Sequence, residues 1–207
     1  HPILLTGIDP AKDQSYVLHM LSAADLPRVR FPIGGLTKVA VREHATRLGL
    51  RTAAKPDSQD LCFVAGDYRS FLRGRIPDGD RPGDIVDADG SVLGRHDGVA
   101  GFTVGQRKGL GVAVGAPRFV LAVDPATATV RVGRRSDLAV DSCTVTGVSF
   151  VVAPVQAGSA VMVRVRYRSI PVAAHLFPTV DGWRVVFAES QEAVAPGQAA
   201  VFYRNDE

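Results

Sequence analysis

The alternation of apolar and polar residues changes near residue 82 of this 207-residue chain. Upstream, apolar residues recur at the three- and four-residue spacing of amphipathic helices. This spacing predicts a helix over residues 13–24, with Asp13 as its N-cap, and a second over residues 37–50. Thr37 would cap the second helix and Gly49 would follow it at the C′ position. The apolar face of the first helix would consist of Tyr16, Val17, Met20, Leu21 and Ala24.

We also expect a short strand over residues 3–8, a turn over residues 31–36 and a short helix from residue 67.

Downstream of residue 82, short alternating strands are separated by Gly, Asp and Pro. Residues 84–98 predict a hairpin that turns at Asp89 and Gly90, and residues 118–133 predict a second one around Asp124 and Pro125. Further β segments at residues 160–177, 182–189 and 197–204 complete an all-β tail. Regular short strands separated by turn signals are typical of a small barrel.

One of these segments, "VMVRVRYR" at residues 161–168, has arginine at every second position. Because strand side chains alternate between faces, Arg164, Arg166 and Arg168 would share one face at a spacing of about 7 Å. That spacing is comparable to the distance between successive backbone phosphates. Tyr167 would lie on the other face, either in the core or as a platform for a base. A solvated outer face of a barrel is the alternative.

Composition adds few constraints. With 46% hydrophobic and 22% charged residues, the chain is ordinary for a soluble globular protein. Its length is that of one or two domains, or of three small ones. A net charge of +3 and a pI of about 9.1 permit a nucleic-acid partner without requiring one. Arginine strongly outnumbers lysine, which suits phosphate contacts but is equally explained by a GC-rich genome.

No signal peptide or apolar run long enough to span a bilayer is visible. The opening "HPILLTGIDP" lacks Met, so we expect a part of a longer protein.

The cysteines and histidines give no structural signature. Cys62 and Cys143 lie far apart, which is neither a disulfide framework nor a CxxC pair, so a reducing cytoplasm is expected. The five histidines are scattered and form no HExxH motif or Cys/His cluster. We therefore expect no structural zinc.

A glycine-rich stretch, "GFTVGQRKGLGVAVG", occupies residues 101–115. It is not a Walker A loop, because no Lys-Ser/Thr pair follows the glycine, and it does not match GxGxxG. Glycines flanking Arg107 and Lys108 would nevertheless let the backbone approach an RNA strand closely. A tight hairpin connection is the alternative.

Cys62, in "KPDSQDLCFV", is the residue with the most open chemistry. It is a packing residue, half of a disulfide, a metal ligand or a reactive sulfur. Asp57 and Asp60 oppose ionisation of the thiol, and only Lys55 is basic nearby. The context also lacks the helix that begins at the cysteine of papain-like proteases. The local sequence leaves the choice open.

Five strings together resemble a known family. "GIDPAKDQSYVL", "KPDSQDLCFV" and "FTVGQRKGLGV" occur in this order, followed by "RVRYR" with "IP" and by "APGQAAVFY". They are similar to the bacterial tRNA 2-thiouridylases, which place sulfur on position 2 of the wobble uridine. The resemblance covers essentially the whole chain. It implies an α+β multidomain fold: the end of an α/β ATP-pyrophosphatase-like catalytic domain (1–65), a small central β-rich domain (66–117) and a C-terminal antiparallel β-barrel (118–207). The SGGxDS ATP loop of the family, and its first catalytic cysteine, lie outside this sequence.

The resemblance also implies a mechanism and a set of site residues. In the family, ATP with Mg²⁺ adenylates the C2 oxygen, a cysteine persulfide delivers sulfur, and a second cysteine resolves the intermediate through a disulfide. By its position in the motif, Cys62 resembles the persulfide carrier, whereas Cys143 falls in no family motif and is expected to be structural. The residues that match tRNA-contacting positions are Lys12, Asp13, Gln14, Arg166, Tyr167 and Gln198. Further candidate contacts to the RNA backbone are Arg107, Lys108, Arg164 and Arg168.

The implied partners are tRNA and a sulfur-relay protein or cysteine desulfurase, for a cytoplasmic, monomeric protein with no membrane partner. Two other functions are alternatives to sulfur transfer. A noncatalytic RNA-binding module with a translation-factor-like barrel describes what this chain would do in isolation, without an ATP site. A cysteine hydrolase lacks both a convincing histidine partner and a nucleophile elbow. The ordered motifs favour the sulfurtransferase.

Overall fold

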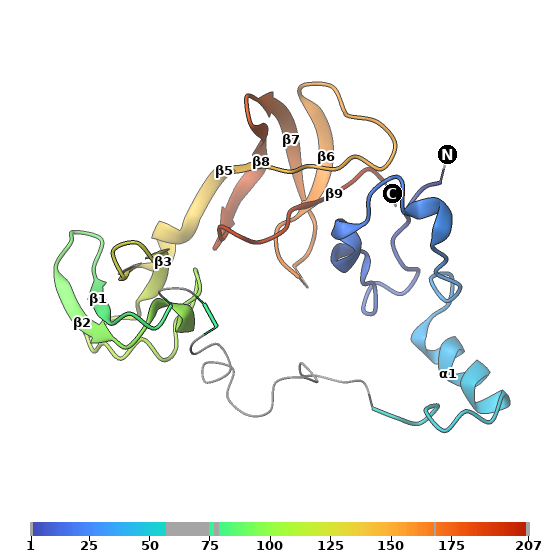
Figure 1. The fold of residues 1–207 in the computed structure, drawn as a ribbon, viewed down its shortest axis with the longest axis horizontal. Helices are drawn as coiled ribbons and strands as arrows, with labels where there is room; N and C mark the ends of the chain where they lie inside the picture. The colour runs from blue at the N-terminus through green and yellow to red at the C-terminus, as the bar shows by residue number, and fades with distance from the viewer. Residues whose placement is uncertain (1, 57–74, 77–78, 168, 206–207) are drawn as a thin grey trace. The chain divides into compact units, whose positions relative to one another are not determined.

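The computed structural model describes residues 2–56, 75–76, 79–167 and 169–205 (Figure 1). The chain divides into two compact units. The terminal unit holds residues 1–57, 141–189 and 197–207, and the central unit holds residues 58–140 and 190–196. The expected short helix from residue 67 and the cysteine loop lie outside the described residues.

The helices are η1 (Ser15–Met20), η2 (Leu26–Arg28), α1 (Lys38–Arg47), η3 (Val99–Gly101) and η4 (Arg135–Leu138), where η marks a 3₁₀-helix. The strands are β1 (Gly83–Val86), β2 (Val92–His96), β3 (Phe119–Asp124), β4 (Thr129–Gly133), β5 (Ala139–Val145), β6 (Ser159–Arg164), β7 (Val172–Thr179), β8 (Gly182–Glu192) and β9 (Val201–Tyr203). The mixed α+β class predicted from the sequence is confirmed. None of the helices in the described ranges is long and apolar enough to cross a membrane.

The central unit contains a four-stranded sheet in the order β2-β1-β4-β3. Both predicted hairpins are confirmed, because β1 pairs antiparallel with β2 and β3 with β4. Gly90 supplies the positive φ of 89° that the first turn requires. Between the hairpins, β1 and β4 run parallel. The expected domain boundary near residue 118 therefore falls between strands of one sheet, and the three-domain division itself stays a prediction.

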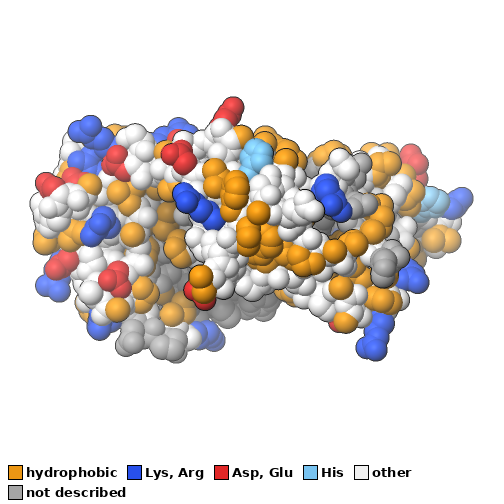
Figure 2. Space-filling model, turned by 90° about the horizontal axis from the view of Figure 1, so that it is seen from above, with side chains coloured by type: hydrophobic (Ala, Val, Ile, Leu, Met, Phe, Trp, Pro, Cys, Tyr) orange, Lys and Arg blue, Asp and Glu red, His pale blue; other side chains and the backbone are white. Residues whose placement is uncertain are grey.

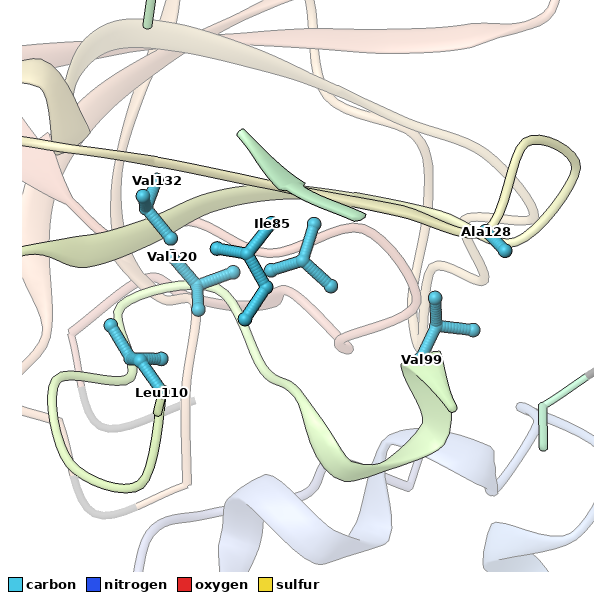
Figure 3. Packing of buried hydrophobic residues seen from close by; sticks show 7 residues of the cluster. Ile85, Val99, Leu110, Val120, Ala128 and Val132 are labelled. Carbon is cyan, nitrogen blue, oxygen red and sulfur yellow. The ribbon is translucent and has the colours of Figure 1, made fainter. Parts of the chain in front are cut away.

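The core of the central unit lies against this sheet. Ile85, Val120 and Val132 are fully buried, and Leu110 reaches the same cluster from the glycine-rich loop (Figure 3). His96 is buried beside them, with Nδ1 accepting from the Gly98 backbone at 3.0 Å and Nε2 3.1 Å from the Ala128 carbonyl oxygen. An imidazole protonated at Nε2 alone satisfies both contacts. The cluster thus holds the glycine-rich loop in place as well as the sheet.

The terminal unit contains a five-stranded sheet in the order β5-β8-β7-β6-β9. Its pairs β6–β7, β7–β8 and β6–β9 are antiparallel, as the sequence predicts for this tail. β5 and β9 lie at the two edges of the sheet. Among the described strands, the sheet is therefore open, whereas the sequence predicts a closed barrel.

The predicted alternation in β6 is confirmed only in part. Val161, Val163 and Val165 are buried on one face, but the strand ends at Arg164. The backbone then turns, because the backbone N–H and hydroxyl of Ser169 both donate to the Arg166 carbonyl, at 3.1 and 2.8 Å. The prediction of three arginines along one strand face is therefore wrong, since Arg166 lies beyond the strand. Arg168 lies outside the described residues.

The N-terminal segment confirms the second predicted helix. Thr37 caps α1 by accepting a hydrogen bond from the Ala40 backbone at 3.3 Å. Gly49 follows at C′ with a φ of 65°, which suits glycine. The predicted turn at residues 31–36 is also present.

The first predicted helix and the first predicted strand are wrong. Residues 15–20 form only the 3₁₀-helix η1, and Leu21 is already extended. Asp13 does not cap it, because Gln14 occupies the N-cap and its side chain makes no capping bond. Two of the expected buried residues, Val17 and Met20, are 44% and 73% exposed. Residues 3–8 form no strand, because Ile8 bonds to Gly34 and Gly7 to an aspartate side chain rather than to a neighbouring strand.

Candidate nucleic-acid interface

A nearly buried ion pair joins the N-terminal segment to the sheet of the terminal unit. The Asp13 side chain is 5% exposed and the Arg164 side chain 15%. Nη1 of Arg164 donates to Oδ2 of Asp13 at 3.2 Å. Asp13 also accepts from the backbone N–H groups of Gly7 and Ser15, at 2.9 and 3.1 Å. One carboxylate therefore fixes the path of residues 7–15 and docks it on the end of β6.

A hydroxyl pair extends this network to β9. Ser15 Oγ donates its single hydrogen to Oδ2 of Asp13 at 2.8 Å, so the Tyr203 hydroxyl, 3.1 Å away, donates to Ser15. The Arg164 guanidinium lies 5.4 Å from the centre of the Tyr203 ring, within the range of a cation–π contact. In Figure 1 the blue N-terminal segment accordingly lies beside β9.

Tyr16 connects the network to two further predicted contact positions. Its hydroxyl donates to the Ala199 carbonyl at 2.9 Å, next to Gln198. Its ring centre lies 6.1 Å from that of Tyr167, with the two planes tilted by 44°. Tyr167 is 47% exposed, so its ring is available to a ligand. Lys12, Gln14 and Gln198 are exposed as well.

The charges in this network are set by its hydrogen bonds. Burial alone would raise the pKa of Asp13, but hydrogen bonds from Gly7 and Ser15 and the charge of Arg164 together hold it below the usual range. Asp13 is therefore an anion at neutral pH. Burial raises the pKa of Tyr16, and the neighbouring Tyr203 adds to the effect, so its hydroxyl stays protonated as a donor. Both groups are thus in the protonation state that their bonds require.

The structure brings together predicted site residues that the sequence places in three separate segments. Lys12, Asp13 and Gln14 come from the first, Arg166 and Tyr167 from the second and Gln198 from the third, and all lie in the terminal unit. Within this set Asp13 has the role of an anchor, because its side chain is turned into the protein. The network also includes Ser15, Tyr16 and Tyr203, which the sequence analysis missed as site residues. Their signal was present in the strings "DQSYVL" and "AVFY", where each sits beside a selected residue.

The remaining candidates lie elsewhere. Arg107 and Lys108 belong to the central unit. Cys62 lies outside the described residues. Cys143 is a free, half-buried thiol whose pKa is raised by burial, so it stays protonated and unreactive at neutral pH. Among the residues with a described position, no three His, Cys, Asp or Glu side chains gather as metal ligands.

On the face drawn in Figure 2, lysine and arginine side chains stand singly or in small groups among acidic and apolar ones, without forming one continuous patch. On this face, therefore, bulk charge does not single out a candidate interface.

Comparison with known proteins decides the family. Three family models match in sequence along the chain: a tRNA methyl transferase HUP domain at residues 1–66, a tRNA methyl transferase PRC-barrel domain at residues 69–134 and an aminomethyltransferase beta-barrel domain at residues 140–207. A tRNA-specific 2-thiouridylase MnmA from Synechococcus sp. (strain CC9605) is 48% identical over 97% of this chain. The chain belongs to the tRNA-specific 2-thiouridylase family.

Other 2-thiouridylases show the same relation. The protein from Xanthobacter autotrophicus is 45% identical over 97% of this chain, and that from Chloroflexus aurantiacus 45% over 99%. The alignments cover 55% of the Synechococcus protein, 53% of the Xanthobacter protein and 58% of the Chloroflexus protein. The chain therefore spans about half the length of these 2-thiouridylases. The family resemblance inferred from the sequence is confirmed.

Proposed function

We propose that this chain is the tRNA-binding part of a tRNA 2-thiouridylase and carries the cysteine that delivers sulfur to C2 of the wobble uridine. The observation that carries the proposal is the convergence of three distant segments on the Asp13–Arg164 ion pair. Lys12, Gln14, Tyr167 and Gln198, which belong to these segments, have exposed side chains. A cation, amide groups and an exposed aromatic ring suit a tRNA loop, whose phosphates and unstacked bases need these partners.

Cys62 would act as a persulfide. The Cys62 thiolate attacks the outer sulfur of a persulfide on a relay protein or cysteine desulfurase, so that Cys62 becomes Cys–S–SH and the donor cysteine leaves as a thiol. The outer sulfur bonds to C2 of the uridine and the C2 oxygen departs with its activating group. A second thiolate then attacks Cys62, and the sulfur–sulfur bond breaks, leaving a disulfide on the protein and sulfur on the base. A persulfide is more acidic than its thiol, so Asp57 and Asp60 hinder its ionisation less.

We assign the binding of ATP and Mg²⁺ to the part of the 2-thiouridylases that this chain does not span. The glycine-rich loop of residues 101–115 does not suit ATP, because it leads into β3 and not into the helix N-terminus that binds phosphates in nucleotide loops. The chain alone would therefore bind tRNA without activating it.

Replacing Arg166 tests the binding surface. We expect Arg166→Ala to weaken tRNA binding and to lower the slope of log affinity against log salt by about one, since one phosphate contact is lost. Tyr167→Ala should weaken binding by about 1–3 kcal/mol through lost stacking, whereas Tyr167→Phe should not. Arg184→Ala is the matched control, because Arg184 is an exposed arginine on β8 of the same unit. Filter binding at several salt concentrations measures the affinity for tRNA and its salt slope. If Arg166→Ala has the same affinity and slope as Arg184→Ala, the proposed surface is contradicted.

A further inference from the structure

A cavity of about 260 Å³ lies in the central unit, between the glycine-rich loop and the start of β3. Arg107 and Arg118 are the charged residues on its wall, and the loop backbone of residues 109–112 forms much of the rest. Among the described residues, no acidic side chain lines it. The cavity therefore has the charge of an anion site.

Arg118 is held in place by an ion pair at one side. Its Nη2 donates to Oδ2 of Asp87 at 2.9 Å, and both side chains are about four-fifths buried, with 17% and 20% exposed. The hydrogen bond from Arg118 holds the pKa of Asp87 below its usual range, so the pair is charged. Nε of Arg118 is buried and has no acceptor among the described residues. A buried donor without an acceptor is costly, and Arg118 lines the cavity, so a small adjustment of its side chain would bring this donor to a bound anion.

Arg107 complements Arg118 from the other end of the loop. It is exposed, and neither it nor Lys108 has a charged side-chain partner among the described residues. One guanidinium is thus held by Asp87 and nearly buried, while the second belongs to an exposed side chain on the wall of the cavity. Such a pair can hold a phosphate from two directions.

The loop itself is preorganised. Gly105 N–H donates to the Val120 carbonyl at 2.8 Å, and Val120 N–H donates back to Gln106 at 2.9 Å. The Gln106 side chain accepts from Thr103 N–H and donates to the Lys108 carbonyl, at 3.0 and 2.9 Å. Leu110 anchors the tip of the loop in the core (Figure 3). Binding would therefore need little ordering of the backbone.

Glycine allows the ligand to come close to this loop. Gly111 has a φ of 73°, and a Cβ added there would meet nothing within 4 Å, so the space beside it is open. The positive φ, rather than packing, is what favours glycine at this position. An oxygen-rich ligand can therefore lie against the backbone.

We propose that this cavity, here named the Arg118 pocket, binds a phosphodiester of an RNA strand through Arg107, Arg118 and the loop backbone. The inference rests on the proposed function and adds a second RNA contact in the central unit. Its volume is below the roughly 300–1,000 Å³ of typical small-molecule sites, which favours one phosphate with its sugar over a whole nucleotide cofactor. Lys108, exposed beside it, is available to the adjoining phosphate.

The pocket can be tested by NMR on the full chain, following the Arg118 Nε–H signal and the backbone signals of Gly109 and Gly111. We expect a short oligouridylate to shift all three signals, and inorganic phosphate or uridine monophosphate to shift them only at much higher concentration. Arg118→Lys keeps a cation for Asp87 but removes Nε, and should weaken the oligouridylate shifts at the two glycines. Equal saturation by phosphate and uridine monophosphate, without shifts from oligouridylate, would overturn the RNA assignment.

Salt-dependent tRNA binding provides the independent measurement. Arg107→Gln should lower the salt slope by about one. Arg95→Gln is the matched control, because Arg95 is an exposed arginine of the same unit with only a 3.5 Å ion pair. If Arg166→Ala weakens tRNA binding while Arg107→Gln and Arg118→Lys behave like Arg95→Gln, the proposed function stands and the pocket is refuted. If only Arg107→Gln and Arg118→Lys lower the salt slope of tRNA binding, RNA binding by the Arg118 pocket is supported and the surface proposed on the terminal unit is refuted.

Discussion

Replacing Cys62 by serine in the full-length protein is expected to abolish formation of 2-thiouridine while leaving tRNA binding nearly unchanged. A serine hydroxyl cannot form a persulfide, so no sulfur reaches C2, whereas the proposed tRNA contacts come from other residues, such as Arg166 and Tyr167. Mass spectrometry of the digested tRNA measures the product, and filter binding measures affinity. The free energy of unfolding should change by less than about 0.5 kcal/mol, as for a replacement away from the core.

Cys143→Ser is the matched control for this prediction. Cys143 is half-buried in β5, and its thiol has a raised pKa, so it is not suited to carry sulfur. Cys143→Ser should therefore retain thiolation in the protein that remains folded. Persistent thiolation in Cys62→Ser, or its loss in a well-folded Cys143→Ser, would refute the assignment of the persulfide to Cys62.

Replacing Asp13 by alanine is expected to give the largest loss of stability. Alanine would leave the nearly buried Arg164 guanidinium without its counter-ion and two backbone N–H groups without an acceptor. Breaking a buried pair in this way typically costs about 3–5 kcal/mol. Urea unfolding measures the change in free energy. Asp181→Ala, at an exposed aspartate of the same unit, is the control and should change it by less than about 0.5 kcal/mol.

The Asp13 network also predicts a pH dependence. The pKa of Asp13 is lower in the folded protein than in the unfolded chain, so ionisation of Asp13 favours folding. This contribution is complete above the unfolded pKa of about 3.9 and is lost as pH falls through the lower, folded value. Asp13→Asn should therefore flatten the fall in stability in that acidic range. If Asp13→Ala costs no more than Asp181→Ala, and the acid profile of Asp13→Asn matches that of the unmodified protein, the ion pair does not hold the interface together.

Local signals predicted the parts of the fold that depend on short-range physics. Thr37 and Gly49 mark the ends of α1, and the turn at Gly90 sets the first hairpin, because capping and positive φ are properties of a few adjacent residues. The alternation in β6 likewise predicted which valines are buried. These features need no knowledge of distant segments.

Long-range contacts explain what the sequence alone did not predict. Asp13 has the residue type of an N-cap, but its carboxylate is used by Arg164, 151 residues away, and by Gly7. The same contact removes Arg164 from the predicted row of RNA-facing arginines. The parallel pairing of β1 with β4 also joins strands that local turn signals place in separate hairpins. The site residues were found through family motifs, whereas the ion pair that gathers them follows from tertiary structure.

The most direct test of the account is the identity of the wobble nucleoside after unmodified tRNA is incubated with the full-length protein, ATP, Mg²⁺ and a persulfide donor. Digestion followed by mass spectrometry distinguishes uridine, 2-thiouridine and a methylated uridine. We expect 2-thiouridine at that position, formed only when the persulfide donor is present. Unmodified or methylated uridine, from protein that is folded and binds the tRNA, would contradict it.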